Sequence, residues 1–173
     1  MRYGLALALL LAWSGPALGQ HRPPSTADAL ALVNRYVAAE TTGAWRKAYS
    51  LVTACRDGGT DFTWVVTGVH VQKPYLRGDT VTVPVIYQTA GTIWETEPHV
   101  ARFSTSQRAD TAAFHVFLGA RRHLWIDCNV ETNHVAASYL RGEATLLDSA
   151  SRADWRAARL PRPRIDPGHR QPN

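Results

Sequence analysis

The chain has 173 residues and a formal net charge of +5. The charge lies at the C-terminal end: residues 152–173 contain six Arg and two Asp, a net +4, whereas residues 20–151 contain twelve basic and twelve acidic side chains. Because the body is neutral and the basic end has a single aromatic residue, Trp155, the chain lacks the pattern of a nucleic-acid-binding protein. We therefore expect no nucleic-acid partner.

Residues 1–19 have the pattern of a secretory signal peptide. Arg2 precedes an uncharged run from Gly4 to Trp13, which is about half the length that a helix needs to cross a bilayer. Ala17 and Gly19 offer small residues for cleavage after Gly19. We therefore expect an exported protein, periplasmic or secreted. No later apolar run approaches bilayer length, so we expect no membrane span. We expect residues 20–25 to form a short spacer.

Cys55 and Cys128 are the two cysteines of the chain. In an oxidising compartment an isolated pair favours a disulfide, although two buried thiols are the alternative. The seven histidines are never at a close ligand spacing, and there is no Cys-x-x-Cys motif. The sequence therefore predicts no metal site and no cofactor.

Residues 26–54 show helical periodicity. Ser25 and Thr26 offer an N-cap, and apolar residues recur at three- and four-residue steps from Leu30 to Ala38. Thr41-Thr42-Gly43 interrupts the pattern before it resumes. Two helices at an angle and one kinked helix fit equally well.

The period then changes to two, which predicts strands at 62–71 and 80–94. Pro84 has no N–H to donate, so its strand should lie at an edge or carry a bulge there. The remaining expectations are a short strand at 99–104, a loop at 106–110, a hairpin of 112–118 with 123–128, and a strand or a helix at 135–147.

Helices followed by several strands without intervening helices predict an α+β fold. We expect an N-terminal kinked helix or helix pair packed on a curved antiparallel sheet of four to six strands. One domain would span residues 26–150, and residues 151–173 would form an Arg/Pro-rich C-terminal tail. The pattern Ser151-x-x-Asp154 resembles a capping box that opens a short helix through Leu160.

Three segments resemble nuclear transport factor 2-like domains, a superfamily with a cystatin-like α+β fold: Val33 to Tyr36, Thr42 to Leu51, and the late strand Leu124 to Asp127. The resemblance covers about residues 26–140 and implies a cone-shaped cavity between a helix and a strongly curved sheet. The superfamily includes isomerases, dehydratases, ligand binders and interaction modules, so the resemblance selects no function. A clear third helix after the first strand is missing from this chain. The carboxylates and tyrosine of the steroid isomerase branch have no matching positions, so no role is carried over.

Acid–base groups for such a cavity would come from Tyr36, Tyr49, Asp61, Tyr87, His115 or Asp127. His115 alternates with Phe114 and Val116, and by this parity we expect it to face away from the core and not to act as a base. We assign no catalytic residue. We expect Tyr36, Tyr87 and Trp94 to contact a ligand.

The function predicted from the sequence is non-catalytic binding of a small apolar ligand or a partner protein. A cavity enzyme of the isomerase or dehydratase type, using proton transfer, is one alternative. A module that binds anionic surfaces through the Arg-rich tail is the other. The sequence does not determine the oligomeric state.

Overall fold

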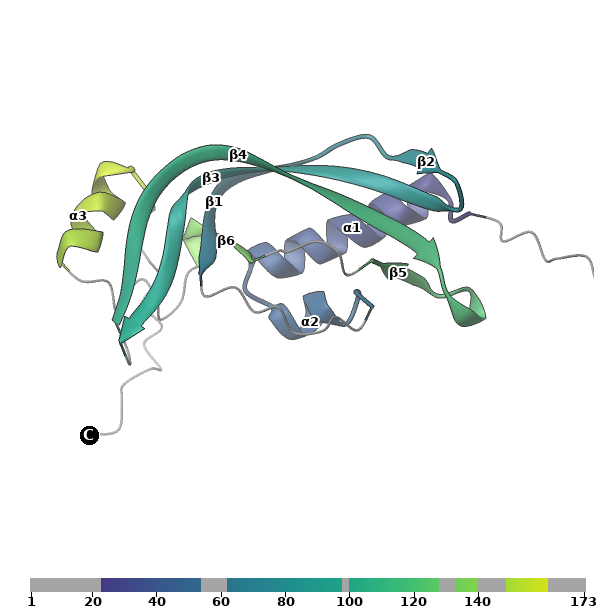
Figure 1. Ribbon diagram of the computed structural model, residues 1–173, viewed down its shortest axis with the longest axis horizontal. Coiled ribbons are helices and arrows are strands. Elements are labelled where there is room, and N and C mark those ends of the chain that lie inside the picture. Colours follow the sequence, from purple (N-terminus) through teal and green to yellow (C-terminus); the bar gives the residue numbers. More distant parts are fainter. Residues whose placement is uncertain (1–22, 54–61, 98–99, 128–132, 140–148, 162–173) are drawn as a thin grey trace, which may run out of the picture.

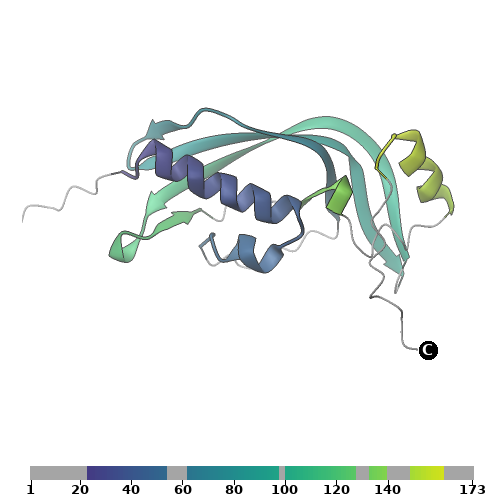
Figure 2. The same cartoon turned by 180° about the vertical axis from the view of Figure 1, so that it is seen from behind.

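The computed structural model describes residues 23–53, 62–97, 100–127, 133–139 and 149–161. The fold is α+β, as predicted, with two N-terminal helices under a strongly curled sheet (Figures 1 and 2). The strand order is β5-β4-β3-β1-β6, and β2 pairs with β3. Among these residues, no helix has the length and apolar character that a membrane crossing requires.

The elements have the following bounds in chain order: α1 (Thr26–Thr41), α2 (Trp45–Tyr49), β1 (Thr63–Val71), β2 (Tyr75–Arg77), β3 (Thr80–Glu97), β4 (Val100–Leu118), η1 (Ala120–Arg122), β5 (Leu124–Ile126), β6 (His134–Ala136), η2 (Ala137–Tyr139) and α3 (Ser149–Ala157). Several predicted features lie outside the described residues: the signal peptide, Cys55, Asp61, Cys128, residues 140–147 and the tail from 162 onward.

The helix pair is the alternative that the structure contains. α1 begins at the N-cap Ser25, whose Oγ accepts a hydrogen bond from the Asp28 N–H at 3.0 Å. Beyond α1, Gly43 has a φ of +68°, a conformation that favours glycine, and the chain turns there into α2. α2 ends at Tyr49, so the second helix is shorter than predicted.

The sheet is mixed rather than purely antiparallel. β1, β3, β4 and β5 form an antiparallel series, whereas β6 pairs with β1 in parallel, with Trp64 opposite His134. A parallel neighbour can come from far along the chain, because it needs a long connection rather than a tight turn. The last described strand in the chain, β6, therefore lies next to the first, β1.

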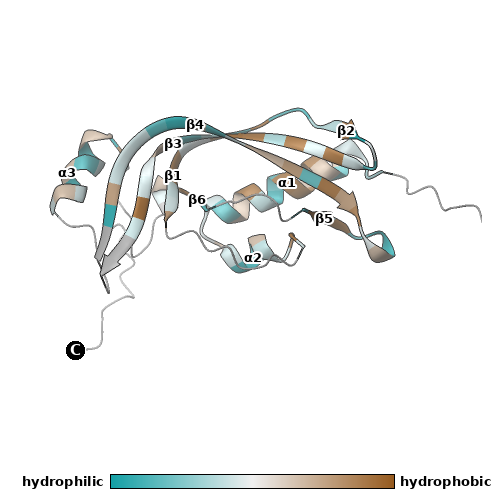
Figure 3. Cartoon of the chain, in the orientation of Figure 1, coloured by the Kyte–Doolittle hydropathy of each residue, from teal (hydrophilic) through white to brown (hydrophobic). Residues whose placement is uncertain are grey.

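Two strand predictions are wrong. β4 runs without a break from Val100 to Leu118, so residues 106–110 form no loop; this hydrophilic stretch is the exposed bend of β4 (Figure 3).

β3 is central rather than an edge strand. Pro84 is tolerated there because its carbonyl accepts from the Gln72 N–H at 2.8 Å, where β1 has ended and β2 has not begun. The N–H that Pro84 lacks would point to the same side. Its absence therefore breaks no hydrogen bond between paired strands.

Extra residues in three neighbouring strands coincide at the bend. The pairing of β3 shifts register between Thr89 and Gly91 on both sides, and β1 shifts between Val66 and Gly68. An odd number of extra residues moves the following side chains to the other face of the sheet. Val85 and Tyr87 therefore face α1 on the concave side, whereas Ile93 belongs to a second core cluster.

This second cluster is formed with α3 on the outer face of the bent end (Figure 1). Trp155 packs edge-on against Phe103 with ring centroids 5.1 Å apart. Ser151 is not the N-cap that the capping-box pattern predicted: it lies inside α3, and its Oγ accepts from the Phe103 N–H at 2.9 Å. Because Trp155 and Leu160 are buried, the folded domain extends beyond residue 150.

Candidate functional site

The space between α1 and the concave face of the sheet is filled with side chains. Leu32, Val33 and Val37 of α1 are buried against strand residues such as Val83 and Val85. Two of the three predicted ligand contacts lie in this packed interior. Tyr36 is 3% exposed, and its ring packs on that of Phe114 with centroids 5.2 Å apart. Tyr87 is fully buried.

A buried polar network lies at the end of this interior, and its centre is Glu40 in the last turn of α1. One carboxylate oxygen, Oε2, accepts from the Tyr87 hydroxyl at 2.9 Å. The other, Oε1, accepts from the His134 backbone N–H at 3.2 Å and lies 3.3 Å from His134 Nδ1. Three donors therefore surround a carboxylate that is 0% exposed.

The imidazole of His134 is fixed in position by its neighbours. Its ring stacks on the Tyr87 ring, with centroids 3.7 Å apart and planes 7° apart. Because a carboxylate can only accept, Nδ1 carries the hydrogen that faces Glu40, and in the neutral ring Nε2 is an acceptor. Nε2 is buried, and no described residue is its hydrogen-bond partner.

Asp110 of β4 connects this network to the surface. Its Oδ2 lies 3.6 Å from His134 Nε2, and its side chain is 38% exposed. Two residues earlier in β4, Arg108 places its guanidinium over the Trp64 ring at 3.9 Å. The result is a row of polar groups from Tyr87 through Glu40 and His134 to Asp110, and only the last of them meets solvent.

The network keeps the phenol of Tyr87 protonated. Burial, with the adjacent Glu40 carboxylate, raises the pKa of the Tyr87 phenol far above its ordinary value. Tyr87 therefore remains a hydrogen-bond donor at the pH at which a free tyrosine ionises. Asp110 is accessible to a molecule from solvent, whereas His134 Nε2 is buried.

The raised pKa of Tyr87 has a measurable consequence for stability. A group with a raised pKa in the folded state contributes stability below its unfolded pKa, about 10 for Tyr, and that contribution is lost as the pH rises above this value. We expect the free energy of unfolding to fall more steeply above pH 10 in the wild type than in Tyr87→Phe. Denaturant unfolding between pH 8 and 11 measures this. Tyr75→Phe, which removes a hydroxyl from an exposed residue, is the matched control; equal slopes in wild type and Tyr87→Phe would contradict the assignment.

The other candidate residues lie apart from the network. His115 is half-buried on the face opposite Phe114, as expected, and its Nδ1 lies 3.0 Å from Thr82 Oγ1. The Asp127 N–H donates to the His115 carbonyl at 2.8 Å. Trp94, the third predicted ligand contact, is half-buried beyond the bend, opposite Arg102. Tyr49 is exposed on α2.

Glu40 and His134 were missed by the sequence reasoning. Glu40 follows Val33 and Val37 at helical spacing, so a carboxylate on the apolar stripe was a usable signal. His134 gave no such signal, because it is brought to Glu40 only by the parallel pairing of β6 with β1.

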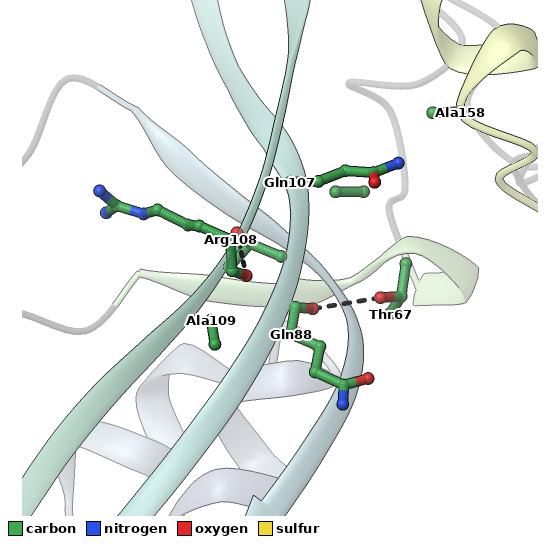
Figure 4. A pocket seen from close by; sticks show the side chains of 8 residues that line it. Thr67, Gln88, Gln107, Arg108, Ala109 and Ala158 are labelled. Atoms are coloured by element: carbon green, nitrogen blue, oxygen red, sulfur yellow. Dashed lines mark hydrogen bonds between the residues drawn. The ribbon is translucent and has the colours of Figure 1, made fainter.

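One open pocket, about 510 Å³, lies at the bend (Figure 4). It is lined by hydroxyl and amide groups such as those of Thr67, Gln88 and Gln107. Arg108 is the charged residue of its lining, and in Figure 4 its side chain extends away from Gln107 and Ala158. The pocket therefore has polar walls without an acid or a base directed into it.

Another pocket, about 260 Å³, lies where β6 leaves β1. It is lined by residues 66–69 and 136–138, together with Thr41 and Pro161. β6 pairs only with Trp64 to Val66, and no described strand pairs with the outer side of residues 67–71 or of β2. We call these two stretches, residues 67–71 and 75–77, the open edge.

Comparison of the chain with protein-family models, curated proteins and solved structures finds no match.

Proposed function

We propose that the protein is an exported, non-catalytic binding module that holds an extended segment of a partner protein at the open edge. The observation that carries this proposal is a strand edge that no described strand pairs with, with exposed apolar side chains beside a pocket. Strand addition at such an edge uses main-chain hydrogen bonds for affinity and pockets for side-chain selection. The curled sheet over paired N-terminal helices also supports membership of the nuclear transport factor 2-like superfamily as part of the proposal.

The backbone of β1 offers the groups that strand addition needs. The Gln72 N–H points toward β3, where it donates to Pro84. Because backbone groups alternate along a strand, those of Val69 and Val71 point outward. Residues 66–72 carry no Asp, Glu, Lys or Arg, so an approaching strand meets no unpaired charge there.

Exposed apolar side chains follow the same edge. Val69 is 38% exposed, and Tyr75 and Leu76 are 50% and 55% exposed. The outer side of β4 differs: its bend is polar, with exposed Arg108, and at Phe103 its backbone bonds to Ser151. An apolar extended segment therefore fits the β1–β2 side better than the β4 side.

The packed interior favours a protein partner over a small apolar ligand. Tyr36 and Tyr87 would have to leave a close-packed core before a ligand could contact them. The anionic-surface alternative remains a prediction, with Arg152, Arg156 and Arg159 exposed on and just after α3.

The test uses a photo-crosslinking amino acid placed at Leu76 or, as a distant control, at exposed Arg121. In the native exported fraction we expect a discrete cross-linked protein from position 76 and none from position 121. Val69→Pro removes an outward N–H, so the cross-link should be lost. Val69→Thr keeps that N–H, so the cross-link should persist. A cross-link that survives Val69→Pro in a folded variant would contradict strand addition.

A further inference from the structure

We propose that His134 and Asp110 bind a divalent transition-metal ion such as Zn²⁺ on the concave side of the sheet. The two residues are not near each other in sequence, which is why spacing alone predicted no metal site. The fold places His134 Nε2 and Asp110 Oδ2 3.6 Å apart.

The starting observation is the chemistry of the atom that faces Asp110. His134 is 1% exposed, and Nε2 is a buried polar atom with no hydrogen-bond partner in the described part of the chain. With Nδ1–H directed at Glu40, the neutral ring presents a lone pair to a carboxylate oxygen. Two acceptors that face each other at this distance are stabilised by a cation between them.

The separation suits a metal ion bound to both atoms. Zn–N and Zn–O bonds of about 2.1 Å, with 3.6 Å between nitrogen and oxygen, give an angle of about 118° at the ion, near the tetrahedral value. Imidazole nitrogen with carboxylate oxygen is a donor set that suits Zn²⁺ and its first-row neighbours.

The partner of the second ring nitrogen of His134, Nδ1, is of the kind found in metal-binding histidines in general. Such a histidine usually donates its other ring N–H to a carboxylate, which fixes the tautomer and makes the ligating nitrogen more basic. Glu40 Oε1, 3.3 Å from Nδ1, has this role here. Stacking on Tyr87 fixes the ring plane, so the direction of Nε2 is set before an ion arrives.

The site would be open rather than closed. The described residues contain no group of three or more potential metal ligands, so water or a bound molecule would complete the coordination. Asp110, 38% exposed, gives the ion a route from solvent. We therefore expect weaker binding than at a structural zinc site with four protein ligands.

Isothermal titration of the full-length, EDTA-treated protein with Zn²⁺ tests the site. We expect one site, with binding at least tenfold weaker in Asp110→Asn, which keeps the shape of the side chain. Asp79→Asn and His123→Ala, at exposed positions, are controls that should bind as the wild type does. In ¹⁵N spectra of the wild type, one histidine should shift at Nε2 while its Nδ1 stays protonated.

Three results would overturn the proposal: equal affinity in wild type and Asp110→Asn, loss of binding in His123→Ala instead, or no Nε2 shift at millimolar Zn²⁺. The last result would mean that only water or a proton occupies the position. The wild-type spectrum decides the question even if Asp110→Asn does not fold. Since Asp110 and His134 are not part of the open edge, these results do not depend on the proposed binding of a partner.

Discussion

Replacing Glu40 by Leu is expected to lower the free energy of unfolding by about 3–5 kcal/mol, because each buried donor that loses its acceptor costs about 1–3 kcal/mol. The variant leaves the buried Tyr87 hydroxyl and both His134 N–H groups without the Glu40 acceptor. Leu has similar volume and good helix propensity, so the loss measures the missing acceptors rather than a cavity. Urea unfolding of the two proteins gives the difference.

Two further variants separate charge from hydrogen bonding. Glu40→Gln keeps one oxygen acceptor and a polar group for Tyr87, so its loss should be clearly smaller. Tyr87→Phe should cost about 1.5–3 kcal/mol in the wild type, where it removes a hydrogen bond to a charged group. In the Glu40→Leu background it should cost much less, because the hydroxyl is already unpaired. Additive losses in this double-mutant cycle would contradict a coupled network.

Replacing Cys55 and Cys128 together by Ser is expected to cost about 4 kcal/mol, since in the chain-entropy model their disulfide closes a loop of about 70 residues. We propose this disulfide because the described segments that precede the two cysteines lie side by side. Val52 forms a parallel bridge with Ile126, and the Thr53 N–H donates to the Ile126 carbonyl at 3.0 Å. Urea unfolding of oxidised wild type and the double variant measures the loss.

The disulfide itself is checked by counting thiols in the unfolded, unreduced protein. The proposal requires none, and two free thiols per chain would contradict it. Reducing the wild type should lower its stability to about that of the double variant. The double variant itself should not respond to reductant.

Local signals were sufficient to predict much of the fold. Ser25 caps α1 as its side chain suggested, Gly43 separates the two helices, and alternation located β1 and most of β3. Prediction failed at the bend. There, the polar run at 106–110 looked like a loop, because a β-strand that is exposed and carries extra residues loses its alternation.

The candidate site was less predictable, because it depends on contacts between distant segments. Tyr87 was selected as a ligand contact, yet its partners Glu40 and His134 come from the end of a helix and from a short strand. A glutamate near a helix end is usually solvated and is disfavoured by the helix dipole. The parallel pairing of β6 brings the two His134 donors that, together with the Tyr87 hydroxyl, stabilise it there.

The parallel pairing of β6 with β1 also determines when the interior can close. Glu40 and His134 are 94 residues apart, and contacts of such separation tend to form late in folding. α1 and the β3–β4 hairpin can assemble from shorter-range contacts, but the Glu40 carboxylate stays in water until β6 arrives. If the chain is exported, as we propose, and crosses the membrane N-terminus first, its polar centre cannot be buried until residue 134 has crossed. A protein built this way remains incompletely folded, and so suited to transport, for most of its passage.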